Sequence, residues 1–215
     1  MNEENRIKRQ LCLPCGRAKK TCICHWVVDI FSLVEVLILQ HPLELNQSKG
    51  SARLLLLSVK NSQLHVGELF DAGALFDILY ASGKQPVLLY PELNVEVGQA
   101  TNTRSILPEG LLAAPENLRL IVLDGTWRKS RKMLHLNSLL QTLPRLSLNN
   151  MPASHYHIRK AHTEDQLSTL EASCYALMKL EKDKEKFLPL LDAFDGFIGQ
   201  QMALREKNKK SCVVL

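Results

Sequence analysis

Three short, strongly apolar segments alternate with longer amphipathic ones along this chain. They are VEVLILQ, QPVLLYP and LRLIVLD, at residues 34–40, 85–91 and 118–124. Each has the length and composition of a strand that is buried on both faces of a sheet. The alternation predicts an α/β fold, with a mostly parallel sheet and flanking helices. In such sheets ligands bind at the carboxyl ends of the strands, so the residues that end these segments are site candidates.

The amphipathic segments predict helices near residues 51–60, 69–80, 127–143, 166–182 and 186–206. RLSL (145–148) and HYHIRK (155–160) are candidate short strands. At 215 residues, with 46% apolar and 23% charged residues, the chain has the composition of a soluble protein with a sizeable core. Because the first residues are polar, basic and rich in cysteine, we expect a small appendage over 1–26 and one main domain over 27–215.

The sequence favours a cytoplasmic protein with no membrane partner. The opening decapeptide, MNEENRIKRQ, has no apolar stretch of the kind found in secretory signals, and the longest apolar run, 27–39, is too short to span a bilayer. The last four residues, 212–215 (CVVL), fit a prenylation pattern, but such patterns arise easily and we prefer a frayed, solvated C-terminus. No sequence feature indicates an obligatory protein partner.

Four cysteines lie within thirteen residues near the start of the chain. Cys12 and Cys15 form a C-x2-C pair, and Cys22 and Cys24 form a C-x-C pair. In a cytosolic protein such thiols are metal ligands more often than disulfides, and four thiolates are the donor set of a tetrahedral zinc site. The spacing therefore predicts bound zinc, with His25 as a substitute ligand candidate and a redox pair as the alternative.

Cations stand between the two cysteine pairs. Arg17, Lys19 and Lys20 would lie on the loop of a rigid metal knuckle, where they suit contact with nucleic-acid phosphates. A solvated basic surface is nearly as common an outcome of the same pattern. The formal net charge of +5 is mild, so the distribution of the cations carries more information than their total.

The segment LDGTWRKSRKML, residues 123–134, places an acid at the end of a strand and cations at the start of a helix. Asp124 ends the apolar run, Gly125 permits a tight turn, and Thr126 can cap the helix that follows. The cations are Arg128, Lys129, Arg131 and Lys132. The helix macrodipole disfavours them there, so an external anion would offset the repulsion. The structural alternative makes Asp124 a helix cap and Trp127 a core residue.

Two further patterns are weaker. Ser168, Thr169 and Glu171 fit an S-x-x-E capping box, which is a common structural signature, although a helix start also offers free N–H groups to a ligand. His155 and His157 would share one face of a strand, and we prefer a polar or RNA-facing strand there to a metal site.

Read together, these stretches resemble the DTW-domain family, whose name describes a D-x-T-W motif, here residues 124–127. The resemblance covers nearly the whole chain. It extends to the four cysteines and to LQHPLE (39–44), LYP (89–91), IRK (158–160) and LSTLEA (167–172). After HPLE the family pattern has an NT-like pair where this chain has Lys49, Gly50 and Ser51, so these three stay outside the predicted site.

The resemblance implies a tRNA-uridine aminocarboxypropyltransferase. Such enzymes transfer the 3-amino-3-carboxypropyl group of S-adenosylmethionine to N3 of a tRNA uridine and release 5'-methylthioadenosine. The family is similar to SPOUT proteins, so the resemblance also implies a C-terminal trefoil knot that holds the cofactor. The alternatives are a SPOUT-like methyltransferase that uses the same cofactor and a zinc-bearing RNA-binding protein without catalytic activity.

The resemblance also assigns the site residues. The expected cofactor contacts are Leu89, Tyr90, Pro91, Leu123, Asp124, Gly125, Thr126, Trp127, Ser168, Thr169 and Glu171. Asp124 is the predicted catalytic base for the N3 proton, and Trp127 is expected to shape the pocket. The residues expected to contact tRNA phosphates are Arg17, Lys19, Lys20, Arg128, Lys129, Arg131, Lys132, Arg159 and Lys160.

Overall fold

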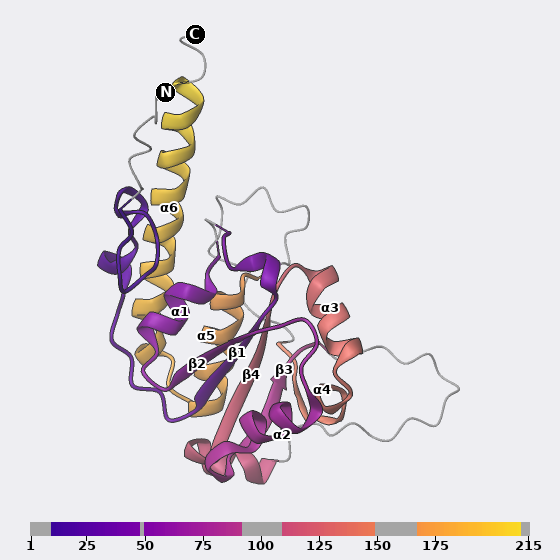
Figure 1. Cartoon of the computed structure of the whole chain (residues 1–215). Helices are drawn as coiled ribbons and strands as arrows, with labels where there is room; N and C mark the ends of the chain where they lie inside the picture. The colour runs from indigo at the N-terminus through magenta and orange to yellow at the C-terminus, as the bar shows by residue number, and fades with distance from the viewer. Residues whose placement is uncertain (1–9, 48–49, 92–108, 149–166, 212–215) are drawn as a thin grey trace.

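The structure, a computed structural model, describes residues 10–47, 50–91, 109–148 and 167–211. Strands and helices alternate along these ranges (Figure 1). The strands are β1 (Glu35–Gln40), β2 (Ser62–Val66), β3 (Gln85–Leu89), β4 (Leu118–Asp124) and β5 (Arg145–Leu146). The α-helices are α1 (Ala52–Ser58), α2 (Ala72–Tyr80), α3 (Trp127–Leu136), α4 (Ser138–Thr142), α5 (Thr169–Glu181) and α6 (Leu188–Ser211).

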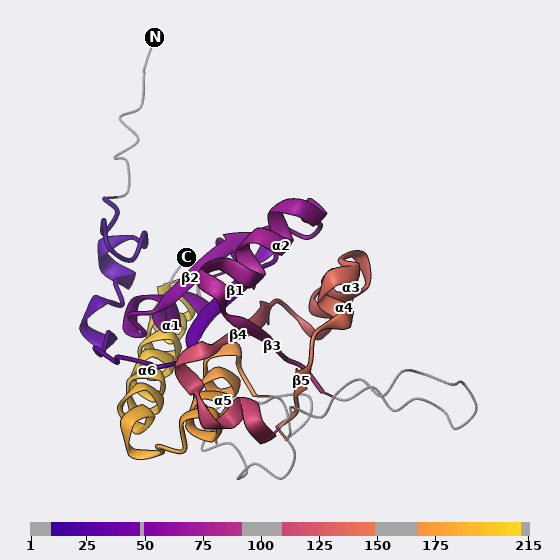
Figure 2. The same cartoon turned by 90° about the horizontal axis from the view of Figure 1, so that it is seen from below.

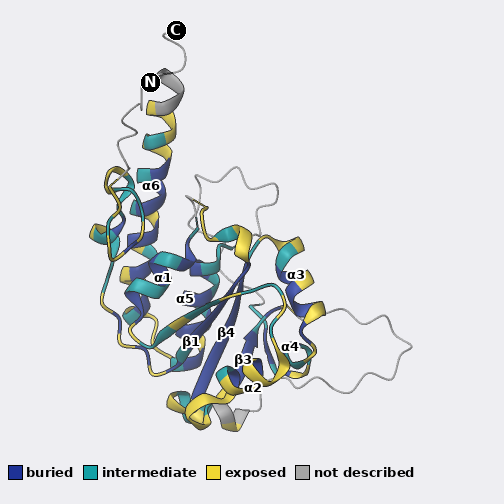
Figure 3. Cartoon of the chain, in the orientation of Figure 1, coloured by how far each residue is buried: buried dark blue, intermediate teal, exposed yellow. Residues whose placement is uncertain are grey.

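The strands of the described chain form one parallel, five-stranded sheet in the order β2-β1-β4-β3-β5. The central pair is β1 and β4, whose register sets Gln40 beside Asp124 at the carboxyl ends. Every residue of β4 is buried, and Figure 3 shows this strand dark blue along its length. The predicted α/β fold with a mostly parallel sheet is therefore confirmed.

Helices cover both faces of the sheet, as the view in Figure 2 shows. Val36 and Ile38 of β1 point into a core that is shared with α1, α5 and α6. The alternate residues Leu37 and Leu39 point into a second core under α2, α3 and α4. Because successive strand residues face opposite sides, burial of both faces requires the continuous apolar run seen in the sequence.

The apolar segments predicted as strands are β1, β3 and β4, and RLSL contributes the two residues of β5. Strand β2 is not predicted, because its sequence, SQLHV, is only intermediate or exposed and lacks the apolar run of a central strand. It pairs with β1 alone and so lies at an edge of the sheet. The segment HYHIRK, with His155 and His157, lies outside the described residues.

The predicted helix over 127–143 is wrong in one respect, because it is two helices separated at Asn137. This residue has an extended backbone, with φ −109° and ψ 91°. Its side-chain amide donates to the carbonyl oxygens of Met133 (2.7 Å) and Glu68 (2.9 Å), and its side-chain oxygen accepts from the N–H of Phe70 (2.9 Å). A side chain that bonds to the main chain in this way competes with helix continuation, which explains the break.

The cysteine-rich segment packs against α6, the indigo and yellow parts of Figure 1. Trp26 Nε1 donates to Gln200 Oε1 (2.8 Å), and Gln200 Nε2 donates to the carbonyl oxygen of Cys22 (3.0 Å). Ile23 is fully buried in the core that α1, α5 and α6 share. The division at residue 26 stays a prediction, but the described part of the segment contributes to the main core.

None of the described helices is long and apolar enough to cross a membrane.

Gly196 of α6 provides a test of how the cysteine-rich segment packs against this helix. An added Cβ would stand 2.1 Å from ring atom Cζ3 of Trp26, so Gly196→Ala is expected to lower the free energy of unfolding by about 1–3 kcal/mol. Gly199, one turn further on, has nothing within 4 Å of the same position. Gly199→Ala is expected to keep or raise stability, by up to about 1 kcal/mol, because alanine favours the helix. Urea denaturation measures both, and equal stability of the two variants would contradict the docking.

Candidate active site

The carboxyl ends of β1 and β4 lie near the start of α5, at the upper edge of the sheet in Figure 1. Asp124 ends β4, and its carboxylate contacts residues of β1 and α5. One oxygen, Oδ2, accepts a hydrogen bond from Gln40 Nε2 (2.8 Å). The other, Oδ1, accepts one from Thr169 Oγ1 (2.7 Å). The residue is only 5% exposed, yet each oxygen keeps a second lone pair for a further partner.

Burial raises the pKa of Asp124 above its usual range. The hydrogen bonds from Gln40 and Thr169 oppose this rise, and Glu44 adds to it while Lys129 subtracts from it. A carboxylate with a raised pKa is a stronger base once it is ionised. The environment of Asp124 therefore suits proton acceptance better than that of an ordinary surface aspartate.

The turn after Asp124 is tight. An added Cβ on Gly125 would stand 3.1 Å from Lys129 Cβ, closer than nearly all such contacts, and 3.7 Å from His41 Cβ. Thr126 occupies the N-cap position of α3, as predicted, but its side chain makes no capping hydrogen bond. The alternative role of Asp124 as a helix cap is not seen either, because its carboxylate bonds to Gln40 and Thr169.

The predicted capping box at the start of α5 is confirmed. The N–H of Glu171 donates to Ser168 Oγ (3.2 Å), and the N–H of Ser168 donates to Glu171 Oε2 (2.8 Å). These two side chains thus stabilise the helix end. Thr169, which stands between them, is the member of this segment that bonds to Asp124.

An aromatic pair borders the site. The ring of Tyr90, just after β3, stacks on Trp127 with centroids 5.2 Å apart and an interplanar angle of 15°. The Arg145 guanidinium lies 5.6 Å from the centroid of the Tyr90 ring. Tyr90 is buried. Trp127 is 53% exposed, so the alternative prediction that Trp127 is a core residue is wrong. The contacts of Thr169 and Tyr90 bring the three predicted cofactor segments, around residues 89–91, 123–127 and 168–171, to one edge of the sheet.

Residues at or just after the ends of β1 and β2 also belong to this site, although they are not among the predicted site residues. The N–H of His41 donates to the carbonyl oxygen of Asp124 (2.9 Å). Its ring accepts from the N–H of Leu43 at Nδ1 (3.1 Å), which leaves the Nε2 proton for Glu68 Oε1 (2.8 Å). The sequence could have predicted Gln40 as a site residue, because Gln40 is a polar residue at the end of an apolar strand, as Asp124 is. Glu68 lies beyond the unpredicted strand β2, so no such pattern indicated it.

Ser51 also belongs to this edge. Its hydroxyl accepts a hydrogen bond from the N–H of Leu170 (3.3 Å), in the first turn of α5, and it is 6% exposed. Ser51 lies outside the predicted site because its segment departs from the family pattern. The contact shows that a serine here still reaches the start of α5.

The four predicted cations of α3 divide into two kinds. Lys129 Nζ pairs with Glu44 Oε1 (2.6 Å) and Lys132 Nζ pairs with Glu68 Oε2 (2.9 Å). Arg128 and Arg131 are exposed on the same helix. The two arginines are thus the cations of α3 that face solvent without an ion pair in the described chain.

The cations of the cysteine-rich segment also differ among themselves. Lys19 and Lys20 are exposed. Arg17 instead donates to the carbonyl oxygen of Gly50 (3.2 Å) and lies 5.1 Å from the centroid of the Phe197 ring. Arg159 and Lys160, and the terminal CVVL sequence, lie outside the described residues.

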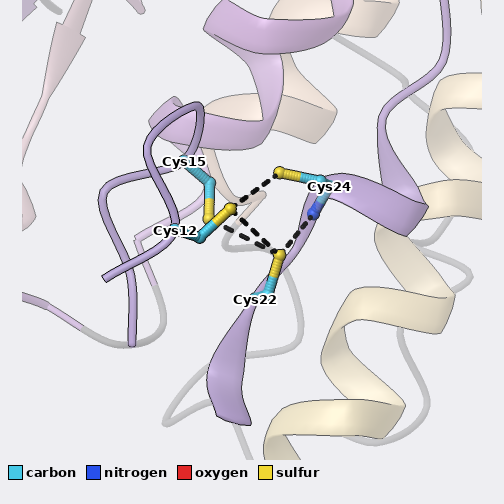
Figure 4. Close-up of side chains that lie close together, drawn as sticks. All are labelled: Cys12, Cys15, Cys22 and Cys24. Carbon is cyan, nitrogen blue, oxygen red and sulfur yellow. Dashed lines mark hydrogen bonds between the residues drawn. The ribbon is translucent and has the colours of Figure 1, made fainter. Parts of the chain in front are cut away.

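The four predicted metal ligands form one cluster (Figure 4). The sulfurs of Cys12, Cys15, Cys22 and Cys24 all lie within 4.8 Å of one another. Three of the separations are 3.5 Å (Cys12 to Cys24), 3.5 Å (Cys22 to Cys12) and 3.9 Å (Cys15 to Cys22). Four thiolates about 2.3 Å from a tetrahedral zinc ion stand about 3.8 Å apart, so the donor set and its spacing fit zinc. His25 is not part of the cluster.

Known proteins show similarity along most of the chain. The proteins named tRNA-uridine aminocarboxypropyltransferase 2 from Macaca fascicularis and Mus musculus are 29% and 30% identical to it, over 88% and 90% of its length. The chain spans 64% and 65% of the lengths of these two relatives. The protein of the same name from Drosophila melanogaster is 27% identical over 83% of the chain and 69% of that relative. No solved structure matches the chain.

A family model described as the DTW domain matches residues 9–202. This match contains the cysteine cluster, the loop after β1, the Asp124 turn and the start of α5. The chain therefore belongs to the DTW-domain family, as its motifs predict.

Proposed function

We propose that this protein is a tRNA-uridine aminocarboxypropyltransferase. The observation that carries the proposal is the buried Asp124 carboxylate, which Gln40 and Thr169 hold at the carboxyl edge of the sheet, beside the cationic start of α3. The names of the relatives give the same activity to proteins of this family. A SPOUT-like knot that holds the cofactor remains part of the proposal.

The proposed transfer needs one proton acceptor. The bond between the uridine N3 and the terminal carbon of the aminocarboxypropyl group forms as the bond from that carbon to the sulfonium sulfur breaks. The electron pair of the broken bond stays on sulfur, which gives the neutral thioether of 5'-methylthioadenosine. The N3 proton goes to the Asp124 carboxylate, directly or through a water molecule. Since the sulfonium is already an excellent leaving group, the protein mainly orients and desolvates the two reactants.

Residues around Asp124 have supporting roles in this proposal. Gln40 and Thr169 fix the orientation of the carboxylate, so its remaining lone pairs keep one direction, in which they can accept the N3 proton. The stacked pair of Trp127 and Tyr90 forms an aromatic wall for a nucleobase or adenosine moiety. Arg128 and Arg131 face solvent and would meet tRNA phosphates near the reacting uridine.

We also propose that the cysteine cluster holds zinc in a structural role. The four thiolates would fill all four positions of a tetrahedral zinc site, which would leave no open coordination position for a substrate. The ion would fix the segment that packs on α6 through Trp26, so its removal would act on stability before it acts on chemistry.

Products distinguish the proposed reaction from its alternatives. Incubation with S-adenosylmethionine and tRNA is expected to release 5'-methylthioadenosine. S-Adenosylhomocysteine would instead identify a methyltransferase, and a protein that binds tRNA but releases neither product would be an RNA-binding protein without activity.

Replacement of Asp124 by Asn tests the assignment of the base. Asn keeps the size of the side chain but loses proton acceptance, so single-turnover rates at saturating cofactor are expected to fall by about 100-fold or more. Cofactor and tRNA affinities, measured at equilibrium, are expected to change much less. In the wild type, the rate is expected to rise with pH as Asp124 loses its proton, at a pKa above the usual aspartate range. Near-normal single-turnover chemistry in Asp124→Asn would rule the assignment out.

Replacement of Arg128 and Arg131 by Ala tests the tRNA surface. The double variant is expected to bind tRNA more weakly and to flatten the dependence of log K on log salt by up to ~0.9 per lost phosphate contact. Stability is expected to hold or rise slightly, because cations leave the start of a helix. Lys60→Ala with Lys184→Ala removes two charges next to the start of β2 and the end of α5, away from the site edge. If this control flattened the salt dependence equally, the proposed surface would be wrong.

Metal analysis of protein purified without added metal tests the zinc site. Wild type is expected to carry one zinc per chain, and Cys12→Ser and Cys22→Ser are expected to lose it and to melt at a lower temperature. Cys174 is a buried cysteine of α5 outside the cluster, so Cys174→Ala is expected to keep the metal. A wild-type protein without bound metal would overturn the proposal.

A further inference from the structure

An ion pair lies beside the Asp124 carboxylate. Lys129, in the first turn of α3, pairs with Glu44 of the short helix Pro42–Glu44 that follows β1, at 2.6 Å. The Lys129 and Glu44 side chains are 24% and 15% exposed, so the pair is sheltered but still accessible. Both side chains contribute to the electrostatic field at Asp124, with opposite signs.

The main chain anchors this pair on both sides of Asp124. The N–H of Glu44 donates to the carbonyl oxygen of His41 (2.8 Å), and the N–H of His41 donates to that of Asp124 (2.9 Å). On the other side, Lys129 Cβ stands 3.1 Å from the position of an added Cβ on Gly125. The cation and the anion are therefore fixed close to the proposed base.

The pair has spare binding capacity. The described contacts use one of the three ammonium donors of Lys129 and one acceptor position of the Glu44 carboxylate. A ligand that carries a carboxylate and an ammonium on one carbon would complement both charges without separating them. S-Adenosylmethionine carries such a group at the end that the proposed reaction transfers, while its product 5'-methylthioadenosine does not.

We infer that Lys129 and Glu44 bind the α-amino acid end of the donor, with Lys129 on its carboxylate and Glu44 on its ammonium. The inference rests on the proposed function, because it assigns the pair to the donor of that reaction. Anchoring the transferred group would hold its terminal carbon toward the acceptor, which selects aminocarboxypropyl over methyl transfer. It also changes the expected role of Lys129 from phosphate contact to donor contact. Lys132, which lies one turn further along α3 and pairs with Glu68, takes no part in the inferred donor contact.

Calorimetric titration with two ligands tests the inference. S-Adenosylmethionine has the amino acid group and 5'-methylthioadenosine lacks it. Glu44→Gln and Lys129→Gln are each expected to weaken S-adenosylmethionine binding by about tenfold or more, with little change for 5'-methylthioadenosine. A general field effect on the positive sulfonium would instead act in opposite directions in the two variants. Lys132→Gln, which removes a cation one turn further along α3, is expected to change neither affinity.

A charge swap separates ligand recognition from a structural tether. Glu44→Lys combined with Lys129→Glu restores an ion pair between the loop and α3, but it exchanges the positions of the charges. Recognition predicts that S-adenosylmethionine binding stays weak in the swapped protein, whereas a tether predicts recovery. Recovery, or equal weakening of both ligands in the single variants, would overturn this inference alone. A wild-type protein that binds neither ligand would overturn the proposed function and this inference with it.

Discussion

A buried carboxylate needs hydrogen-bond partners, and at Asp124 this requirement connects three separate parts of the chain. Gln40 at the end of β1 and Thr169 at the start of α5 each donate to one oxygen. If either element shifted, a buried charge would lose a partner, which costs more than an ordinary surface contact. The register that sets Gln40 beside Asp124 is therefore part of the site, as well as part of the sheet.

A series of contacts also connects the cysteine cluster with this edge. Arg17, which follows the first cysteine pair, donates to the carbonyl oxygen of Gly50. The next residue, Ser51, accepts from the N–H of Leu170 in the first turn of α5. The cysteine-rich segment thus supports the segment that contacts α5, the helix that carries Thr169. The proposed zinc site would therefore support the edge of the sheet that carries Asp124, apart from any contact that its own cations make.

The sequence was sufficient for the parts of the molecule that local patterns define. Continuous apolar runs predict β1, β3 and β4, because a strand that is covered on both faces needs apolar residues at nearly every position. The edge strand β2 and the break at Asn137 were not predictable, since they depend on pairing with β1 and on hydrogen bonds to Glu68 and Phe70. Motif spacing located Asp124 and the cysteines, but the ion pair between Glu44 and Lys129 joins residues that only the fold brings together.

The cations at the start of α3 illustrate this limit. In the sequence, all four cations of α3 oppose the helix macrodipole, which suggests that an external anion compensates them. In the fold, Glu44 and Glu68, from the segments after β1 and β2, neutralise Lys129 and Lys132. Arg128 and Arg131 remain exposed, so an external polyanion has fewer charges to compensate than the sequence suggests. Because the two lysines already have carboxylate partners, the helix tolerates its charge without an external anion, and the two arginines are left for the proposed contact with RNA.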